Sequence, residues 1–429
     1  MFYFNIALKS ILNRHQQYKS LFAVTAVGIC IMLSALMITD GMIKSMNEKA
    51  RQYYGGDVQF IGGSSLNKSL EQADKEAAEI KKCLGKEDAI VIERYNHDAE
   101  DENYYFEGTS VMQRSIIGVN FENEKELFSK FSFVEGSYER GEYEDTVLLS
   151  EPIAKKLGCH VGDSITYYCP TDRGINTVPL VLTGIFQDAS VFGMYTSYVN
   201  YNTLIKTLEY EPIVDRVSVY YLNGEPSERE LKRLYSKLSE NFLMYPYGIS
   251  KKDFYADFKY ERDKSIDKWC LIRLSQNVTD LKLLVSALQL IVAAIVLLLM
   301  IIISVGISST YRVIVIKRNI ESGTLRAIGM RPSGIMKMFV AEAFLLLVTG
   351  ALTGFIVSFI IVKIISGFNL SFVSGFDLFL TGGCLNPYVN GLKIIGLVTV
   401  IIVTTLASVL FTLRKLVHVS PVSAMATTT

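Results

Sequence analysis

The chain has 429 residues, with 43 basic and 43 acidic side chains, so its formal net charge is zero. A neutral balance excludes a strongly basic nucleic-acid-binding protein, and 9 prolines with 30 glycines exclude a collagen-like or low-complexity chain. Six cysteines without a Cys-x-x-Cys spacing are too few for a disulfide scaffold, and they form neither a zinc-knuckle nor a redox motif.

Apolar residues are concentrated in four blocks, of which only the third contains a charge, Glu342. The blocks are residues 21–38, 283–311, 339–362 and 394–413. A bilayer core is crossed by a helix of about 20 apolar residues. We therefore predict an α-helical membrane protein with four transmembrane helices. The first is predicted to be an uncleaved anchor instead of a signal peptide, because a long mixed segment precedes it and no small-residue cleavage site follows.

The distribution of charge predicts the orientation of these helices. Lysine and arginine gather in the N-terminal stretch, in the connection between the second and third blocks and in the C-terminal tail. Such segments face the cytoplasm, so both termini are predicted to be cytoplasmic. Residues 42–280 carry 29 basic and 39 acidic side chains and are predicted to lie outside. The zero net charge is therefore a cancellation between two compartments.

The predicted organisation follows in chain order. It is an amphipathic N-terminal helix with transmembrane helix 1 (1–41), a large extracytoplasmic α+β domain with helical stalks (42–280), transmembrane helix 2 (281–311), a basic cytoplasmic segment (312–337), transmembrane helix 3 (338–363), a short outer loop (364–392), transmembrane helix 4 (393–413) and a cytoplasmic tail (414–429).

Periodicity within residues 42–280 predicts two strand–helix–strand units. The first has strands at 57–61 and 89–95 around a helix at 66–84, and the second has strands at 216–222 and 243–247 around a helix at 227–242. Two such units, flanking a strand-rich insertion of about residues 112–213, indicate a ferredoxin-like subdomain.

The outer ends of the first two transmembrane helices are expected to continue as helical stalks. Met42, Met46 and Ala50 extend the first at helical spacing, and the second is preceded by aromatic residues across 254–281. Flexible linkers are the alternative, since isolated helices are marginal without a partner.

Motifs for catalysis and for metal binding are missing from the sequence. It contains no GxxxxGK[ST], HExxH, GxSxG or GxGxxG, and its four histidines are scattered. We predict no catalytic residue, no metal site and no cofactor on this chain. The acidic stretch at 98–102 favours a solvated turn over a calcium loop. Cys159 and Cys169 are either a disulfide or two buried thiols.

One basic segment carries a specific pattern. Arg318, Glu321, Gly323, Leu325, Arg326, Ala327 and Gly329 stand in the order and spacing found in one family. The segment resembles ABC transporter permeases of the macrolide-exporter and lipoprotein-releasing superfamily, also called type VII or mechanotransmission transporters. Further stretches agree with this resemblance: residues 4–24, 56–58, 147–165, 178–186 and 420–424.

The resemblance implies a permease subunit without its own nucleotide-binding motif, in the bacterial cytoplasmic (inner) membrane. Its expected partners are a separate cytoplasmic ATPase dimer that binds ATP and magnesium, a second permease copy or homologue, and membrane lipids. A periplasmic carrier or adaptor is a further candidate, and no nucleic acid is expected. The implied function is lipoprotein release or export from the outer face. A regulatory or receptor-type protein that controls a partner such as a cell-wall hydrolase is the alternative, and a structural anchor without an ATPase is a third.

The same resemblance makes residues 312–337 a coupling segment that contacts the ATPase. Its candidate residues are Arg318, Glu321, Leu325, Arg326, Ile328, Gly329 and Met330. Arg318 and Glu321 can pair on one helix face, and Gly329 before Pro332 predicts a helix stop. A basic surface that only holds lipid headgroups is the alternative.

Three other features are candidates outside that segment. Glu342 is expected to pair with a basic residue such as Arg326, or else to be a surface carboxylate at the end of its helix. Gly350 and Gly354 form a GxxxG that predicts close helix packing, within or between chains. A hairpin with Pro170, Gly174 and Pro179 is either a hook for a carrier protein or an ordinary turn.

Overall fold

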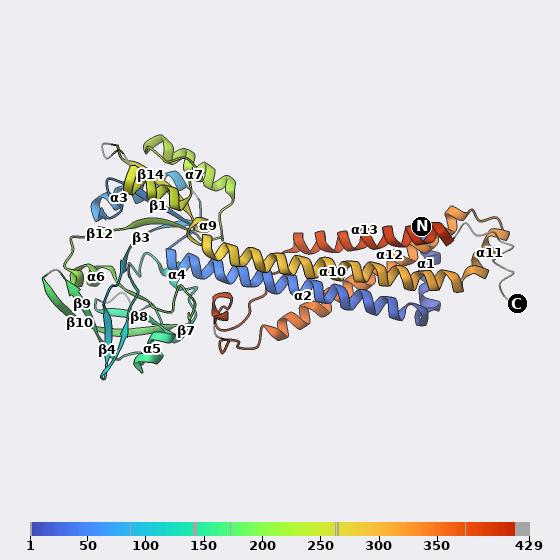
Figure 1. The fold of residues 1–429 in the computed structure, drawn as a ribbon, viewed down its shortest axis with the longest axis horizontal. Coiled ribbons are helices and arrows are strands. Elements are labelled where there is room, and N and C mark those ends of the chain that lie inside the picture. Colours follow the sequence, from blue (N-terminus) through green and yellow to red (C-terminus); the bar gives the residue numbers. More distant parts are fainter. Residues whose placement is uncertain are drawn as a thin grey trace. The chain divides into compact units, whose positions relative to one another are not determined.

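The structure is a computed structural model that describes residues 2–416 except 86, 140–143, 172, 262, 264, 265 and 374 (Figure 1). It divides into two compact units. The helical unit contains the chain up to Ile43, Val285–Phe368 and the chain from Leu385. The mixed unit contains Lys44–Leu284 and Asn369–Cys384. The predicted tail motif at 420–424 lies outside the described residues.

The helical unit is built from six helices of the described chain. They are α1 (Phe2–Asn13), α2 (His15–Tyr54), α10 (Thr279–Lys317), α11 (Asn319–Ala327), α12 (Pro332–Ile365) and α13 (Gly391–Leu416). Four of them, α2, α10, α12 and α13, are long and apolar enough to cross a membrane. Each predicted apolar block lies within one of these four helices.

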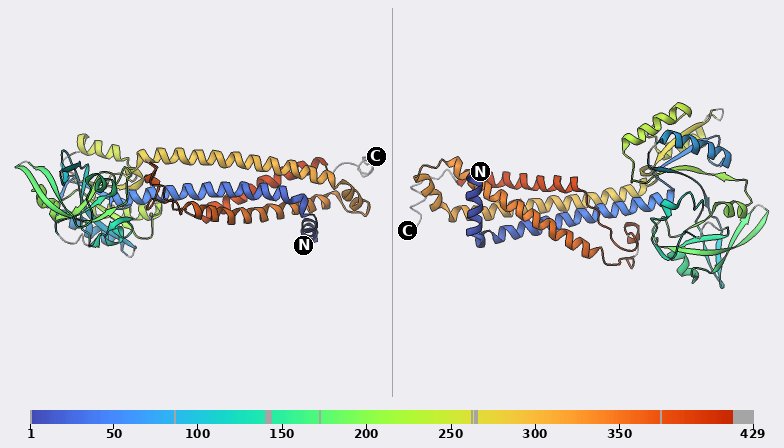
Figure 2. Two further views of the ribbon diagram at one scale, coloured as in Figure 1. Left: turned by 90° about the horizontal axis from the view of Figure 1, so that it is seen from below. Right: turned by 180° about the vertical axis from the view of Figure 1, so that it is seen from behind.

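Close packing holds the helical unit together. Figure 2 shows α2 and α10 side by side, and a Cβ built at Gly28 of α2 would lie 2.3 Å from Ile303 Cδ1 of α10. Leu33, Phe339 and Ile401, from three different helices, are at most 1% exposed in one shared apolar core. By contrast α10 turns most of its apolar surface outward, as a helix does when lipid covers it.

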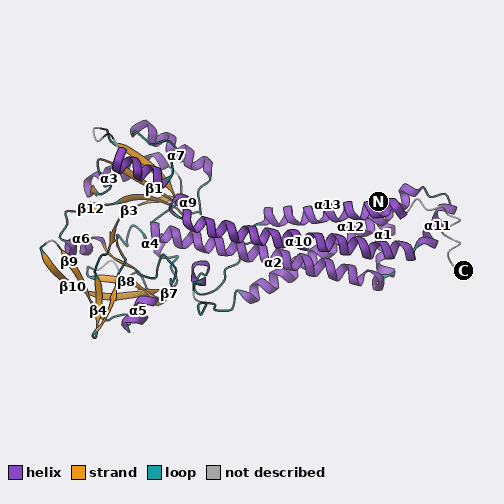
Figure 3. Cartoon of the chain, viewed as in Figure 1, coloured by secondary structure: helices purple, strands orange, loops and turns teal. Residues whose placement is uncertain are grey.

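The mixed unit contains every described strand of four or more residues (Figure 3). Its ferredoxin-like part has four antiparallel strands in the order β14 (Lys268–Arg273), β1 (Val58–Gly63), β13 (Arg216–Tyr221) and β3 (Ala89–Asp98). Helix α3 (Leu70–Leu84) connects β1 to β3, and α7 (Glu228–Asn241) precedes β14. This is the ferredoxin-like arrangement that the two strand–helix–strand units indicated.

The position of the fourth strand was predicted wrongly. Residues 243–247 form only one bridge, from Met244 to Trp269, and the strand is β14 instead. The helical stalk predicted over 254–281 is wrong for the same reason. That stretch holds the end of α8 (Lys251–Ala256), a π-helix (Asp257–Glu261), β14 and α9 (Leu274–Asn277). Six-residue pairing of β14 with β1 overrides the helical spacing of the aromatic residues.

The insertion extends the same sheet. The second half of β3 pairs with β6 (Ser115–Val119), while its first half pairs with β13. Beyond β6 the order is β11 (Thr196–Asn200), β8 (Thr146–Ser150), β10 (Gly174–Phe186), β9 (Ser164–Thr171), β4 (Asn103–Phe106) and β5 (Thr109–Met112), with β7 (Phe133–Gly136) against β10. Strands β2 (Lys68–Ser69) and β12 (Ile213–Val214) form a separate pair. Short helices α4 (Lys125–Phe128), α5 (Glu151–Leu157) and α6 (Tyr201–Leu208) complete it.

The predicted outer loop is more than a connection. Its central part, residues 369–384, belongs to the mixed unit and includes a 3₁₀ turn, η3 (Phe376–Phe379). Leu378, Phe379 and Leu380 are buried there. This loop therefore contributes apolar and charged side chains to the mixed unit.

Candidate functional site

A buried ion pair lies at the start of the coupling segment. The Nη1 atom of Arg318, the residue between α10 and α11, is 2.7 Å from Oε2 and 2.9 Å from Oε1 of Glu342 on α12. Glu342 is 0% exposed. A carboxylate removed from water needs a partner and further hydrogen bonds. The pair therefore holds the turn before α11 against α12.

Tyr18 completes the hydrogen bonding of this carboxylate, and Tyr311 lies beside it. Tyr18 of α2 donates to Glu342 Oε2 at 2.9 Å, and Arg318 Nη1 donates to the Tyr18 hydroxyl at 3.1 Å. The Tyr311 hydroxyl lies 3.4 Å from Oε2 and donates to the Phe339 carbonyl at 2.5 Å. Three long helices thus meet at one carboxylate, which makes it a fixed joint of the helical unit.

Glu342 thus pairs with a basic residue of the coupling segment, as expected, but that residue is Arg318, and the alternative of a surface carboxylate is wrong. Arg318 takes the place that we expected for Arg326, and the carboxylate is fully buried instead of lying at the surface. The reason is a break in the helix. Arg318 has φ −101° and ψ 17°, so α10 stops at Lys317 and the chain turns into α11. If α10 continued as one helix through residue 318, the Arg318 side chain would not be placed against α12.

Glu321 extends the cluster to the N-terminal segment. It accepts from Arg318 Nε at 3.0 Å, which confirms the predicted pair three residues apart, and it also pairs with Arg14 between α1 and α2. The cluster thus contains two arginines and two glutamates. We name Arg14, Arg318, Glu321 and Glu342 the helical charge cluster.

The rest of the coupling segment divides into packed and exposed residues. Leu325 and Met330 are half-buried against the core of the helical unit, whereas Ile328 is 80% exposed. Gly329 has φ +98°, and α12 begins at Pro332, as the predicted helix stop requires. Ile328 is therefore the most exposed apolar side chain among the candidate residues of this segment.

The GxxxG pair packs within the chain. A Cβ at Gly350 would lie 2.8 Å from Thr25 Cγ2, and one at Gly354 would lie 2.7 Å from the Ala26 carbonyl oxygen. Both contacts are with α2. Of the two alternatives left open by the sequence, packing within the chain is the one that the described residues show.

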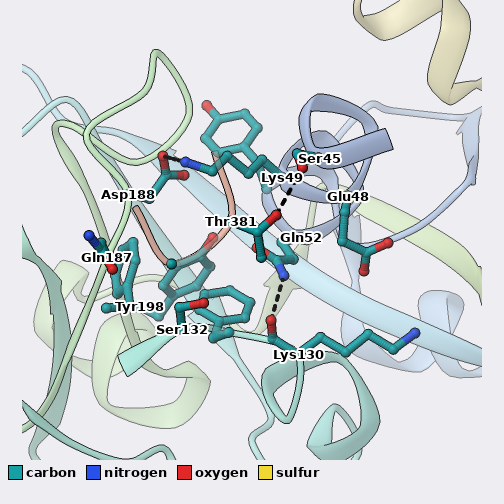
Figure 4. Close-up of a pocket in the computed structure, with 14 residues that line it drawn as sticks. Ser45, Glu48, Lys49, Gln52, Lys130, Ser132, Gln187, Asp188, Tyr198 and Thr381 are labelled. Carbon is teal, nitrogen blue, oxygen red and sulfur yellow. Dashed lines mark hydrogen bonds and ion pairs between the residues drawn. The ribbon is translucent and has the colours of Figure 1, made fainter. Parts of the chain in front are cut away.

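A second charge cluster, in the mixed unit, was not found from the sequence (Figure 4). Lys49 of α2 is 8% exposed, and its Nζ lies 2.9 Å from Asp188 Oδ1 and 2.7 Å from Asp377 Oδ2. Asp188 follows β10 and Asp377 lies in η3. Asp377 Oδ2 also accepts from the Ala189 backbone N–H at 2.7 Å. One ammonium thus joins three segments that are far apart in the sequence.

The pocket beside Lys49 is small. Its cavity volume of about 40 Å³ has room for a few water molecules, and Thr381 donates to Ser45 across it at 2.9 Å (Figure 4). Burial raises the pKa of Asp188, against the opposing effect of Lys49. This arrangement is a joint between segments and not a binding cavity. We name Lys49, Asp188 and Asp377 the outer charge cluster.

Comparison with known proteins finds a matching domain family and similar transport proteins. A family profile described as FtsX-like permease C-terminal matches residues 285–421, the segment that contains the helical charge cluster. The macrolide export ATP-binding/permease protein MacB of Burkholderia cenocepacia is 27% identical over 262 residues, and MacB of Burkholderia lata matches equally. Residues 285–421 therefore match an FtsX-like permease domain, and the chain is similar to ABC transporter permeases of the MacB type.

The extent of these matches is partial. The matched region is 59% of this permease and 32% of the Burkholderia proteins, so the permease spans about a third of their length. The periplasmic region of MacB from Actinobacillus actinomycetemcomitans aligns with 53% of this chain and 92% of its own at 10% identity and a TM-score of 0.31. A domain of a permease protein from Porphyromonas gingivalis aligns with 46% and 83% at 13% identity and a TM-score of 0.29. Family and apolar helices together indicate a multi-pass protein of the bacterial inner membrane.

The predicted hairpin of the permease differs from its expected form. Strand β9 ends at Thr171 and β10 begins at Gly174, so the connection is residues 172–173, of which 172 is outside the described part. Pro170 pairs with Ile175 inside the ladder, and Pro179 pairs with Thr166. The prediction of Pro170 as a turn residue is therefore wrong, because this strand continues past it.

The acidic turn is also only partly as predicted. Asp98, Glu100 and Asp101 are exposed, but Glu102 is 3% exposed and lies 2.6 Å from His97 Nε2. The Tyr167 hydroxyl donates to it as well. Within the described residues no group of His, Cys, Asp or Glu is arranged to hold a metal ion, and Cys159 and Cys169 are buried free thiols.

Proposed function

We propose that this chain is a permease subunit that couples ATP hydrolysis by a separate cytoplasmic ATPase to movement of its mixed unit on the outer face of the membrane. The observation that carries the proposal is the helical charge cluster. It attaches the start of α11 to α2 and α12, while Ile328 at the end of α11 stays exposed. A displacement of α11 by a bound protein is then passed to the transmembrane helices.

The energetics support a rigid attachment. Removing one member of a buried ion pair costs about 3–5 kcal/mol, because an uncompensated charge is left behind. Thermal motion alone therefore does not separate Arg318 from Glu342. The apolar contact of Ile328 with a partner supplies binding, and the buried pair supplies the mechanical connection.

The substrate and the partners belong to the same proposal. We infer a complex of two permease chains, identical or homologous, with two ATPase subunits that bind ATP and magnesium. Lipoprotein release or export of a substrate from the outer face fits the four apolar helices. Described residues of these helices bury one carboxylate, Glu342, and it is already paired, so no chain of ionisable groups marks a polar route. The Burkholderia relatives are macrolide export ATP-binding/permease proteins.

The orientation in this proposal is tested by cysteine labelling of intact cells, in a background without the six native cysteines. Gly174→Cys, at the start of β10, is expected to react with a membrane-impermeant thiol reagent. Ser322→Cys, in α11, is expected to react only after the membrane is permeabilised. The reverse pattern would place the mixed unit in the cytoplasm and overturn the orientation.

The coupling itself is tested at Ile328. Ile328→Asp puts a charge on the exposed apolar side chain and leaves every basic residue in place. We expect loss of ATPase co-purification, or retained association with hydrolysis that no longer drives activity. Ser333→Asp adds the same charge five residues further on, at an exposed position, and is expected to have little effect. If Ile328→Asp retains both association and activity, α11 is not the coupling element.

A further inference from the structure

The mixed unit contains a second, larger pocket that the coupling mechanism does not use. Its cavity volume is about 220 Å³, and its lining comes from the end of α2, from β1, β3 and β13, and from α8. Polar side chains from separate segments converge on it. Those used below are Tyr53, Asn96, Asp215, Arg216, Lys251 and Tyr255.

The hydrogen-bond acceptors of this pocket are already occupied. Asp215 Oδ1 accepts from the Asn96 backbone N–H at 3.0 Å, and Asp215 Oδ2 accepts from Arg216 Nε at 2.6 Å and from Arg216 Nη2. The side-chain oxygen of Asn96 accepts from Ser115 Oγ at 2.6 Å. A ligand therefore finds few acceptors on these walls.

Donors remain in excess. Four donor groups of the lining have no hydrogen-bond partner within the described residues: Arg216 Nη1, the Asn96 amide nitrogen and the hydroxyls of Tyr53 and Tyr255. None of these four is a buried atom without a partner, so each is accessible to solvent. Burial raises the pKa of Tyr255, with Arg216 opposing, so this hydroxyl keeps its proton at neutral pH and can donate. The pocket thus offers a set of donors that a ligand rich in acceptor oxygens would satisfy.

The charge of the lining selects among such ligands. Arg216 is paired with the Asp215 carboxylate through Nε and Nη2, and its Nη1 is left to donate. A singly charged carboxylate can accept two N–H bonds from the guanidinium and the amide. A doubly charged phosphate would be repelled by the neighbouring Asp215 carboxylate. The tyrosine rings and Ile61 supply the apolar part of the lining, which can contact a short carbon skeleton.

We propose that this pocket binds a carboxylate-bearing ligand of the size of one or two amino-acid residues, with its carboxylate on Arg216, Asn96 and Tyr255. The volume is below the roughly 300–1,000 Å³ of pockets for drug-sized ligands, which excludes a large substrate from this site. A free amino acid and the C-terminal end of a peptide share the required chemistry. This inference goes beyond the proposed function and does not depend on it, because binding is measured without an ATPase.

The first test compares an acid with its amide. The full chain in lipid nanodiscs is titrated with L-alanyl-L-alanine, with L-alanyl-L-alanine amide, with L-alanine and with inorganic phosphate, and binding is measured by calorimetry or ligand-observed NMR. The dipeptide acid is expected to bind at least about tenfold more tightly than its amide, since a charge-assisted hydrogen bond is lost. Tighter binding of the dipeptide than of alanine assigns a peptide end, and the reverse assigns a free amino acid.

The second test uses variants of the pocket. Arg216→Gln is expected to weaken binding of the better carboxylate probe by about tenfold or more. Because that variant also leaves Asp215 without its partner, Tyr255→Phe is the second variant. It removes one hydroxyl, keeps the ring and is expected to weaken binding several-fold. Arg233→Gln, an exposed arginine on α7 in the same unit, is the matched control and is expected to bind as the parent does.

Several results would overturn the assignment. These are equal affinity for the acid and the amide, tighter binding of phosphate than of either carboxylate, no saturable binding of any probe, or unchanged binding by Tyr255→Phe. A failure of the coupling tests at Ile328 would leave these results untouched, and failure here would leave the coupling proposal untouched.

Discussion

The helical charge cluster and the outer charge cluster each connect segments that are far apart in the sequence, but they differ in their balance of charge. The helical charge cluster has two arginines and two glutamates. The outer charge cluster has one lysine and two aspartates, and the pKa of Asp188 is raised by its burial. The helical charge cluster has equal numbers of the two charges, whereas protonation of Asp188 relieves an excess of negative charge in the outer charge cluster. The comparison teaches that an unequal number of buried charges makes the outer charge cluster sensitive to pH.

The largest effect is expected when the balanced cluster is broken. Arg318→Met leaves Glu342 buried without its cation and is expected to cost about 3–5 kcal/mol, seen as reduced membrane abundance and a lower unfolding temperature. Adding Glu342→Gln removes the orphaned charge and is expected to recover most of the loss. Arg312→Met, an exposed arginine of α10, is the control. If Arg318→Met behaves like this control, the buried pair is not structural.

A smaller effect is expected in the outer charge cluster. Lys49→Met leaves two carboxylates together, but Asp188, whose pKa is already raised by burial, can take up a proton, so the cost is expected to be about 2–4 kcal/mol at neutral pH. Hydrogen exchange of the full chain should show faster exchange around residues 186–190 and 376–380. Lys252→Met, at an exposed position of α8, should exchange as the parent does. Unchanged exchange in Lys49→Met would contradict a joint at this position.

The next largest loss of stability is expected where the apolar helices α2 and α12 pack closely. Gly354→Leu drives a side chain into the Ala26 carbonyl and is expected to cost about 1–3 kcal/mol through displacement of α2 from α12. Gly306→Leu on α10 meets no atom within 4 Å and serves as the control. The thermal stability of the purified chain separates the two. Equal stability of both variants would show that close packing of α2 on α12 is dispensable.

The smallest effect is the pH dependence that distinguishes the two clusters. A carboxyl whose pKa is raised by folding stabilises the fold at pH values below its ordinary pKa of 3.8, and that contribution is lost as pH rises through the raised value. Asp188→Asn removes this dependence and keeps the oxygen that accepts from Lys49 and Ser190. Unfolding of the variant relative to the parent, followed from pH 4 upward, should therefore show the variant gaining stability as pH rises. A constant difference would mean that Asp188 does not titrate in this range.

Features of this structure that depend on neighbouring residues could be predicted from the sequence, whereas features that depend on contacts between distant residues could not. The four apolar helices can be predicted from local composition, because a lipid-spanning helix needs an unbroken apolar block. The first strand–helix–strand unit is equally local. The strand β14 was missed because its aromatic residues fit a helical spacing, and only pairing with β1, about 210 residues earlier in the chain, makes it a strand.

The candidate site was predicted less completely for the same reason. Arg318 and Glu321 were found as a local pair, and Glu342 was found as a lone charge in an apolar block. Their connection depends on a helix break that has no proline or glycine to mark it. Lys49, Asp188 and Asp377 are 139 and 189 residues apart in the sequence, and nothing local distinguishes them from surface charges.

The central claim is that the Arg318–Glu342 pair transmits the action of an ATPase, and ATP hydrolysis by the assembled complex tests it most directly. Glu342→Gln keeps the size of the side chain and leaves Arg318 paired with Glu321. At equal membrane abundance and equal ATPase association, we expect permease-stimulated hydrolysis to fall several-fold, while Glu211→Gln, an exposed residue of the mixed unit, leaves it unchanged. Full stimulated hydrolysis in Glu342→Gln would contradict the claim.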